Sequence, residues 1–419
     1  MPRIPPSIGL PDTARYRPYS VAEAIEHYDE RLRSGSDVLY RPIATGFRFL
    51  DQAFGGGLRI EDLVVYGGKA NVGKTIKGLQ IVCQSAELDP SVLGIYVCYE
   101  HSIVTLLQRV LCQASVQDPD APVVRGVTRN AIEAAVQACY ARARTPAQRR
   151  ALDMGAILER VPGAEVAWWR LERFMDRVWL IHGDSLETTL EHLHHYVTLA
   201  KGQGFRRIVL IVDYVQRMPL NPLLMQAGLS SLQQIDLLMR GLKGLAMSEE
   251  ISVGGVVAAD EQGVRQDRVH LENLWGPSTM QYEPDAGVVL NKDGLTHASG
   301  AIAIRESIEK NRNGQSDIEA RHWLHGAHYH LSPTGQPVAE EESFQLERQG
   351  LRRDAARPGV LGAGPQIAFL GLLALSQWRE DNGVVLDLLR QASRAEDGGQ
   401  SLWPDMLSLM EKAVATAPS

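Results

Sequence analysis

Short apolar runs alternate with longer amphipathic stretches through the first three quarters of the chain. Six runs rich in β-branched residues break off at Gly, Asp, Glu or another polar residue: LVVYG (63–67), GIYVCYE (94–100), VWLIHGD (178–184), RIVLIVDY (207–214), SVGGVVAAD (252–260) and AGVVLNKD (286–293). None alternates strictly between apolar and polar positions, which is typical of strands buried on both faces. Because helical stretches separate these runs, the pattern predicts an α/β domain with a mostly parallel, twisted sheet flanked by helices.

A separate amphipathic helix is predicted from Ser20 onward. Ser20 and Glu23 have the spacing of a capping box, and one helical stripe carries the apolar side chains Val21, Ala24, Ile25, Tyr28 and Leu32. The stripe is narrow, so the helix packs either on its own domain or on a neighbouring subunit.

Changes in patterning along the chain predict its domain organisation. Residues 1–40 form an arm with early prolines and the amphipathic helix, and 41–335 form the α/β core. Within the core, a polar, Ala/Arg-rich stretch at about 113–176 predicts an inserted pair of helices. Residues 336–364, rich in Glu, Arg and Gly, suit an exposed linker, and helical patterning returns in a C-terminal appendage at 365–419.

Composition places the chain among ordinary globular proteins. Hydrophobic residues make up 44% and charged residues 22% of its 419 positions, with no apolar run long enough to cross a bilayer and no signal-peptide core. We therefore expect a cytoplasmic protein whose four cysteines are reduced thiols. The net charge of -7 argues against a surface coated in nucleic acid, but permits a ring that grips a strand in its central channel.

The strongest local motif is GKANVGKT, which follows one predicted strand and precedes a predicted helix. Glycines at these positions let backbone N–H groups close around phosphates at a helix N-terminus, and the pattern is that of a phosphate-binding loop. Lys74 is placed to neutralise the β- and γ-phosphates of ATP, and Thr75 to offer a hydroxyl to Mg²⁺. The predicted nucleotide-binding residues are Gly68, Asn71, Val72, Gly73, Lys74, Thr75 and Ile76.

Two strand-end carboxylates extend this site. Asp213 ends the apolar run RIVLIVDY, where an acid is placed to hold Mg²⁺ directly or through water. Glu100 ends GIYVCYE, the strand that follows the helix of the loop, and is placed to polarise an attacking water. Together they predict hydrolysis rather than nucleotide binding alone.

The order of these motifs resembles the core of DnaB-type replicative helicases, from about Thr45 to Gly335. The resemblance rests on TGFRFLDQAFGGGLRIEDLVVYGGKANVGKT, YVCYEHS, LIVDYVQRM and KNRNG. It implies a RecA-like P-loop NTPase core, a homo-oligomer that is a hexameric ring, and single-stranded DNA as partner. It also implies that Lys310 and Arg312 reach the γ-phosphate bound by the adjacent subunit. The single glutamate of YEHS fits DnaB-type proteins better than the paired glutamates of KaiC-like proteins.

The chain departs from that family in two places. Asp260 and Glu261 stand where such helicases usually carry a Ser and a Gln that sense the γ-phosphate, and a carboxylate cannot donate the same hydrogen bond. Gln262 is one residue away and is placed to take that role. The stretch expected to face the channel carries Arg265 and Arg268 as phosphate ligands and Trp275 as a base-stacking residue, although a solvated basic loop with a packed Trp is an equal interpretation.

Two histidine-rich stretches raise the question of a metal site. In EHLHHY, Glu191, His192, His194 and His195 do not align good ligands on one helical face. The stretch RHWLHGAHYH is interpreted as an exposed strand with alternating polar residues. We therefore expect no metal other than Mg²⁺.

The sequence favours an ATP-driven, ring-forming motor on single-stranded DNA, most simply a DnaB-like helicase acting in DNA replication. Only about forty residues precede the core, which fits an accessory or mobile-element helicase better than a chromosomal one. Two alternatives stay open. One is a KaiC-like regulatory ATPase without translocation, and the other is a loader or scaffold whose C-terminal helices bind a protein partner.

Overall fold

The computed structural model describes residues 18–35, 40–226, 228–277 and 279–338. These residues belong to one compact unit that ends at Val338. The first seventeen residues of the predicted arm, most of the predicted linker and the whole predicted appendage at 365–419 lie outside the described residues.

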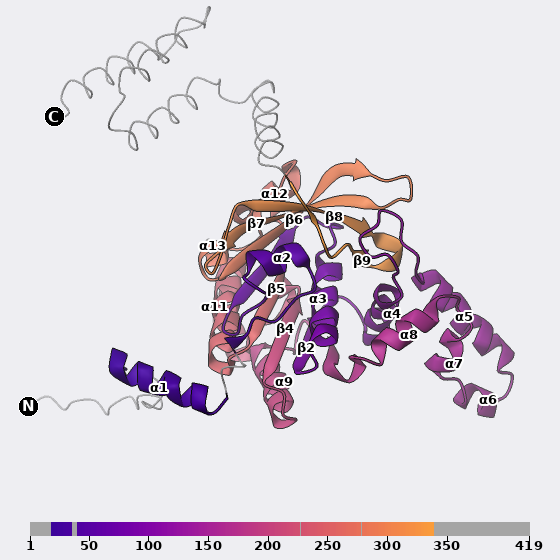
Figure 1. Cartoon of the computed structure of the whole chain (residues 1–419), viewed down its shortest axis with the longest axis horizontal. Helices are drawn as coiled ribbons and strands as arrows, with labels where there is room; N and C mark the ends of the chain where they lie inside the picture. The colour runs from indigo at the N-terminus through magenta and orange to yellow at the C-terminus, as the bar shows by residue number, and fades with distance from the viewer. Residues whose placement is uncertain (1–17, 36–39, 227, 278, 339–419) are drawn as a thin grey trace, which may run out of the picture. The chain divides into compact units, whose positions relative to one another are not determined.

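A mixed sheet of ten strands organises this unit (Figure 1). Along the sheet the order is β10-β8-β7-β6-β1-β5-β4-β2-β3, and β9 pairs with β8. Strands β6, β1, β5, β4, β2 and β3 are parallel and include all six predicted runs, whereas β7 to β10 extend the sheet in antiparallel fashion beyond the prediction. The strands are β1 Leu63–Gly68, β2 Val92–Cys98, β3 Val178–His182, β4 Arg207–Asp213, β5 Ser252–Ala258, β6 Ala286–Thr296, β7 Ile302–Asn311, β8 Ile318–His325, β9 His330–Leu331 and β10 Gln336–Pro337.

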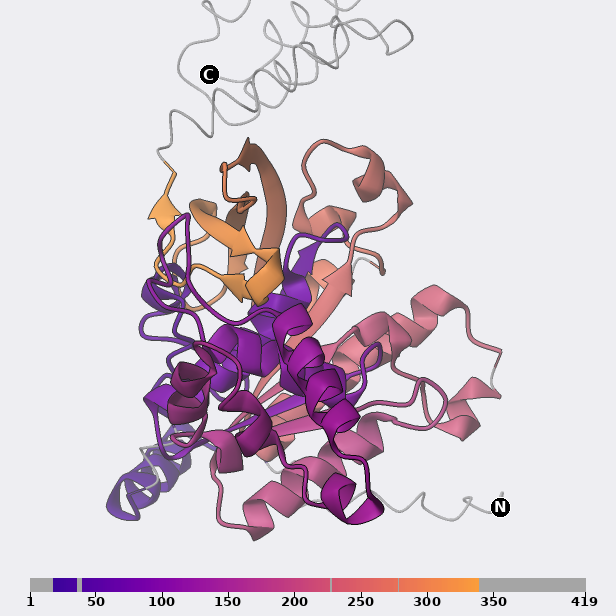
Figure 2. The same ribbon diagram turned by 90° about the vertical axis from the view of Figure 1, so that its right-hand side faces the viewer.

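Helices cover both faces of the parallel strands, because each strand is apolar on both sides. In β4, Val209 and Ile211 face one apolar cluster and Ile208, Leu210 and Val212 the other. The first cluster includes α3 and α4, and the second α9 and α11. The result is a three-layered α/β/α core (Figures 1 and 2). Its helices are α2 Arg48–Ala53, α3 Lys74–Leu88, α4 Ile103–Ala114, α9 Leu190–Gly202, α10 Pro222–Met225, α11 Ser231–Glu249, α12 Glu261–Arg265 and α13 Thr279–Tyr282.

The inserted segment contains four helices instead of the predicted pair. They are α5 Arg129–Arg142, α6 Pro146–Arg150, α7 Met154–Leu158 and α8 Ala164–Leu171. The prediction was wrong because strong N-caps restart the helix at short intervals. Thr128, Thr145 and Asp153 each accept a hydrogen bond from a backbone N–H in the following first turn, and Pro146 occupies the first position of α6.

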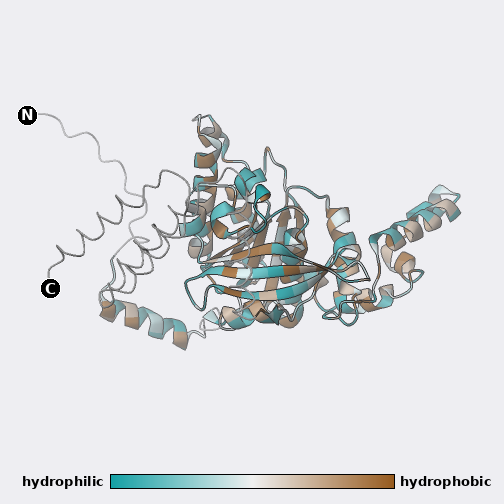
Figure 3. Cartoon of the chain, turned by 90° about the horizontal axis from the view of Figure 1, so that it is seen from above, coloured by the Kyte–Doolittle hydropathy of each residue, from teal (hydrophilic) through white to brown (hydrophobic). Residues whose placement is uncertain are grey.

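Helix α1, Val21–Arg33, forms as predicted but its apolar stripe is uncovered. The capping box of Ser20 and Glu23 is present, and no residue of the helix is buried. Val21 is 80% exposed and Ile25 58% exposed. Figure 3 shows hydrophobic and hydrophilic residues alternating along this helix. Within the described unit, the stripe therefore does not pack on its own domain.

Strand β8 corrects the interpretation of RHWLHGAHYH as an exposed strand. It lies between β7 on one side and β9 and β10 on the other, so its histidines are enclosed. His322 is fully buried, and His325 and His330 are nearly so. The alternation of polar residues indicated a strand correctly, but the antiparallel extension of the sheet covers them.

The buried end of this extension holds a cluster of charges. The Lys77 ammonium of α3 donates to the Glu306 carboxylate of β7 at 2.8 Å, and His322 lies 3.1 Å from the same oxygen. All three side chains have no exposed surface, and the ammonium lies 3.6 Å from the ring centre of Phe47. Burial alone would raise the pKa of Glu306, but Lys77 and His322 hold it at about 2. The cluster ties the helix of the phosphate-binding loop to β7.

In the described part of the chain, no helix combines the length and apolar character that a membrane crossing requires.

Removing one member of the buried pair should cost far more than removing both. We expect Lys77→Met to lower the free energy of unfolding by about 3–5 kcal/mol, because it leaves the Glu306 carboxylate without its main counter-charge. The double variant Lys77→Met/Glu306→Leu should recover most of that loss, since no buried carboxylate remains. Urea unfolding of the three proteins measures both effects. A double variant no more stable than the single one would contradict the argument.

Candidate nucleotide-binding site

The carboxyl ends of the parallel strands bring the predicted residues of the core together. The loop from Gly68 to Gly73 follows β1, Asp213 ends β4, and Glu100 lies two residues beyond β2. Strands β4 and β2 are neighbours, with Asp213 directly opposite Cys98 in the register. Polar groups that follow buried parallel strands meet at one edge, where open α/β sheets form their ligand sites.

Two glycines give the loop its path. Gly68 has φ +142°, and a Cβ built there would lie 2.3 Å from the carbonyl oxygen of Leu290 on β6. Gly73 has φ +91° and caps α3, which begins at Lys74. Together they turn the chain so that the backbone N–H groups at the start of α3 are available to phosphates. Of the other predicted loop residues, Val72 is buried in the core, Asn71 is exposed with φ +60°, and Thr75 and Ile76 continue the first turn of α3.

The Lys74 ammonium is folded back over its own loop. It donates to the carbonyl oxygens of Gly68 at 2.8 Å and Lys69 at 2.6 Å. Burial lowers its pKa to about 8, against the opposing charges of Asp213 and Glu100. A phosphate group within reach would favour the charged form and could replace the two carbonyls as partner.

Asp213 is a buried carboxylate with one oxygen to spare. Tyr96 donates its hydroxyl proton to Oδ2 at 2.6 Å, while Oδ1 has no hydrogen-bond partner among the described residues. Burial raises the pKa of Asp213 to about 6, which the Tyr96 hydrogen bond opposes and the Glu100 charge assists. A free oxygen on a buried carboxylate, at the start of α3 and near the Thr75 hydroxyl, fits the preference of Mg²⁺ for hard oxygen ligands.

Glu100 is held in place by an arginine that the sequence analysis did not identify. Arg217, in the 3-10 turn that follows β4, contacts the Glu100 carboxylate at 3.1 Å. The glutamate is only partly exposed, at the same edge as the loop and Asp213. The ion pair fixes the direction of a carboxylate that could orient or deprotonate a water.

Lys310 and Arg312 lie at the opposite edge of the sheet. Lys310 is opposite Gly287 on β6, which pairs with Val65, and the Arg312 backbone binds Asp285 just before β6. A strand rises about 3.3 Å per residue, so the six residues of β1 separate these cations from the loop by roughly 20 Å. Both side chains donate to the carbonyl oxygen of Tyr282, and Arg312 also pairs with Asp285 at 3.0 Å. They are therefore not part of their own subunit's site.

The loop expected to face a channel is more engaged than its sequence suggested. Arg268 forms an ion pair with Glu319 on β8, and Trp275 is 36% exposed. Asp260 caps α12 by accepting from the Gly263 N–H at 2.5 Å. Arg265 alone of the three predicted nucleic-acid residues is an exposed charge at the end of that helix.

Comparison with solved structures identifies the architecture. The ATPase domain of a DnaB-like helicase matches with 16% identity and a TM-score of 0.56, covering 75% of this chain and 99% of that one. A DnaB-like replicative helicase, whose interactions with primase were described with its structure, matches with 16% identity and a TM-score of 0.54, covering 75% and 67%. The fold is RecA-like. A KaiC-like protein from the archaeon Pyrococcus horikoshii also aligns, with 11% identity and a TM-score of 0.42, over 71% of this chain and all of that one.

No protein-family model and no curated protein matches the chain. The solved structures therefore establish the RecA-like fold alone.

Two residues of this RecA-like site were missed from the sequence. Tyr96 lies inside an apolar run, where a tyrosine indicates only a buried aromatic side chain, and Arg217 follows the strand-end aspartate in an unpatterned turn. Their roles arise from contacts across β2 and β4, between residues more than a hundred positions apart. A polar-tipped residue within a buried run, such as Tyr96, was the one available signal.

The side chains that usually bind transition metals serve other purposes in the described residues, where no three His, Cys, Asp or Glu are grouped to hold an ion. His192 accepts from the Thr189 N–H at the start of α9, and His194 pairs with Glu249 at 3.3 Å. His195 stacks obliquely on Tyr196. All four cysteines are buried and free of disulfides, as expected.

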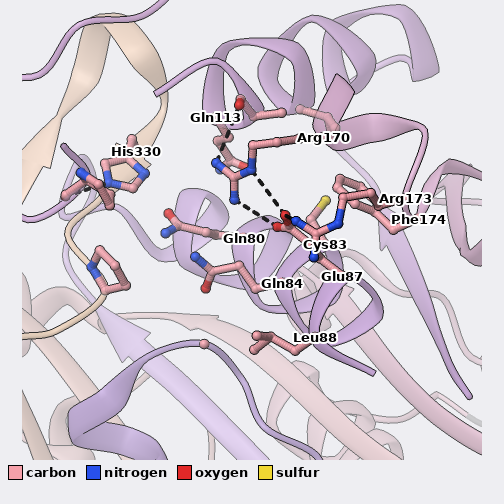
Figure 4. A pocket seen from close by; sticks show the side chains of 15 residues that line it. Gln80, Cys83, Gln84, Glu87, Leu88, Gln113, Arg170, Arg173, Phe174 and His330 are labelled. Atoms are coloured by element: carbon pink, nitrogen blue, oxygen red, sulfur yellow. Dashed lines mark hydrogen bonds and ion pairs between the residues drawn. The ribbon is translucent and has the colours of Figure 1, made fainter. Parts of the chain in front are cut away.

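A cavity of about 300 Å³ lies behind α3, away from the phosphate-binding loop. Its walls come from α3, α4 and α8, and Figure 4 shows Arg170 reaching Glu87 within it. That ion pair measures 2.8 Å. The cavity contains none of the predicted nucleotide-binding residues and is separate from the site.

Replacing the buried aspartate should stabilise the nucleotide-free protein. Because the folded pKa of Asp213 is raised, its ionised form carries a penalty that is absent below pH 3.8 and complete above about pH 6. Asp213→Asn retains the acceptor for Tyr96 and should raise the free energy of unfolding by about 1–3 kcal/mol near pH 8. The gain should shrink toward about pH 4.5, which denaturant titrations at the two pH values would measure. An equal gain at both would refute the assignment.

Loss of the Tyr96 hydroxyl should shift the acid limit of Mg²⁺-dependent hydrolysis. Tyr96→Phe removes a hydrogen bond to the ionised form of Asp213, so its pKa should rise by about one further unit. The acid limb of the ATPase pH profile should then move upward by a similar amount. Tyr66→Phe is the matched control, since the buried Tyr66 hydroxyl has no partner among the described residues. Identical profiles for the two variants would contradict the role of Tyr96.

Proposed function

We propose that the chain is an ATP-driven, ring-forming motor on single-stranded DNA, a DnaB-like helicase that hydrolyses ATP at the interfaces between subunits. The observation that carries this proposal is the separation of Lys310 and Arg312 from the phosphate-binding loop by the full length of β1. Each subunit presents half of a site at one edge of its sheet and two cations at the other. A closed ring of identical subunits joins these unlike edges.

The residues of one subunit divide the chemistry among them. Lys74 and the N–H groups at the start of α3 bind the phosphates, and Thr75 and Asp213 would hold Mg²⁺. When bound, the ion neutralises charge on the β- and γ-phosphate oxygens. Glu100, held by Arg217, orients the attacking water and accepts its proton. Lys310 and Arg312 of the adjacent subunit stabilise the charge that develops on the transferred phosphate.

The exposed stripe of α1 supports association between subunits. An amphipathic helix with no buried residue leaves its apolar area in water, and a neighbouring copy offers the cover that its own domain does not. The helix is fixed in direction at one end, because Arg31 pairs with Glu250 at 2.6 Å and lies over the ring of Tyr40.

A KaiC-like regulatory ATPase without translocation is the second candidate. Two observations favour it: Asp260 is occupied in capping α12, and Arg268 is paired with Glu319. These contacts leave Gln262, Arg265 and Trp275 as the remaining predicted sensor and channel residues. The ATPase rate decides between the two, because a motor on DNA is stimulated by single strands and a regulatory ATPase is indifferent to them. The third hypothesis, a loader or scaffold that binds a protein through residues 365–419, predicts that deletion from Pro337 abolishes partner binding and spares hydrolysis.

Mixing two inactive variants tests the shared site. Arg312→Ala should lower the DNA-stimulated ATPase rate on the order of 10³-fold, as loss of an arginine finger does, and Lys74→Ala should abolish hydrolysis. In equimolar mixed rings, about a quarter of the interfaces should join an intact loop to intact fingers, so activity should return to about that fraction of wild type. ATPase assays with and without single-stranded DNA measure each case.

The controls separate the shared site from the DNA partner. A double variant carrying Lys74→Ala and Arg312→Ala in one chain, mixed with either single variant, creates no intact interface and should stay inactive. Absence of recovery in the two-variant mixture would exclude a shared site. A wild-type rate unchanged by DNA would instead exclude the motor and favour the regulatory ATPase.

A further inference from the structure

Helices α5 to α8 form an arm between β2 and β3 in the sequence. Helix α8 packs on α4, and Ile132, Leu158 and Phe174 join the same apolar cluster as α3, so the base of the arm is anchored. Figures 1 and 2 show α5, α6 and α7 extending away from the sheet. The turn from α5 to α6 therefore forms an outlying, exposed end.

This end, residues 140–150, carries charge of one sign. Arg142, Arg144, Arg149 and Arg150 are all exposed, and the sequence has no Asp or Glu from 134 to 152. In the described part of the chain none of the four arginines forms an ion pair, and the preceding Glu133 is engaged by Arg129 at 2.7 Å. A chain with net charge -7 thus gathers four uncompensated cations within nine positions.

Local helix stability accounts for only part of this composition. A cation in the last turn of a helix interacts favourably with its carbonyl end, and Arg142, Arg149 and Arg150 occupy such positions. That effect does not require four arginines, and it does not disfavour carboxylates in the first turn of α6. The repulsion between the guanidinium groups is instead relieved by an anionic partner.

An aromatic side chain lies among these cations. Tyr140 is 54% exposed, and the Arg149 guanidinium lies 4.7 Å from its ring centre. The Arg149 Nε also donates to the carbonyl oxygen of Ala143 at 3.1 Å, which holds the guanidinium over the ring. A tyrosine that is exposed and braced in this way can stack on a nucleobase, while the neighbouring guanidiniums bind phosphates.

We propose that residues 140–150 form a binding surface for single-stranded nucleic acid, outside the ATPase site and the predicted channel loop. The combination of unpaired guanidiniums with an exposed tyrosine favours this partner over an acidic protein segment, which would use the charges and leave the ring without a role. The inference takes its partner class from the proposed function, but it concerns binding without nucleotide. In a motor, this surface would guide a strand on the outside of the ring.

Salt-dependent binding of a labelled oligothymidylate to the full-length protein, without nucleotide, tests the surface. The variant Arg142→Ala/Arg144→Ala/Arg149→Ala/Arg150→Ala should reduce the slope of log K against log salt by about 3, since each phosphate contact on a single strand contributes about 0.7. The four-lysine variant at these positions should keep most of the slope. Tyr140→Ala should weaken binding about tenfold and leave the slope unchanged, because stacking releases no counterions.

A charge-matched control removes four exposed arginines elsewhere, Arg41, Arg48, Arg125 and Arg206. If this control lowers the slope as much as the arm variant, the effect is one of net charge and the proposal is wrong. Binding of poly-glutamate through the arm in place of the oligothymidylate would also overturn it, and would assign the surface to an acidic protein.

The two proposals fail in different ways. The arm variant should retain DNA-stimulated hydrolysis at saturating DNA if the motor proposal holds. Arm-dependent DNA binding with an ATPase rate indifferent to DNA would refute the motor and support the arm. DNA-stimulated hydrolysis with no effect of the arm variant on binding would do the reverse.

Discussion

Burial of the central strands on both faces constrains where this protein can place polar groups. Strands β1, β4 and β5 lie between two apolar helix layers, so charged side chains are admitted only where a strand ends or where a partner neutralises them. At the carboxyl edge the phosphate-binding loop, Glu100 and Asp213 meet for this reason. At the amino edge the same rule places Lys310 and Arg312 beside Asp285 and the carbonyls of α13.

The exceptions to that rule carry most of the chemistry. Asp213 is held ionisable in the core by one tyrosine hydroxyl and a nearby ammonium, and its raised pKa leaves it poised to exchange a proton for a cation. Lys74 is buried with its charge bound by loop carbonyls, which a phosphate would displace. The Lys77–Glu306 pair is fully satisfied in charge, and its position between α3 and β7 joins the loop helix to the strand that ends at Lys310. A movement of α3 on binding phosphate would therefore be transmitted to β7.

The fold also leaves surfaces that one subunit does not use. The apolar stripe of α1 and the arginine-rich end of the arm differ in chemistry, since one favours a protein neighbour and the other a polyanion. Both lie on segments attached to the core at one end. Their partners can change without disturbing the sheet, whereas the nucleotide site depends on the register of β1, β4 and β2.

Contiguous stretches of sequence determined the six parallel strands, the phosphate-binding loop and the strand-end acids, because each depends on local patterning or on neighbours a few residues away. The capping box of α1 was predicted for the same reason. Only the tertiary structure decided that Tyr96 serves Asp213, that Arg217 holds Glu100, and that Glu319 engages Arg268. The burial of His322 and the edge occupied by Arg312 likewise depend on how β7 and β8 pair. These contacts join residues far apart in the chain, and spacing along a sequence contains no record of which strand ends become neighbours.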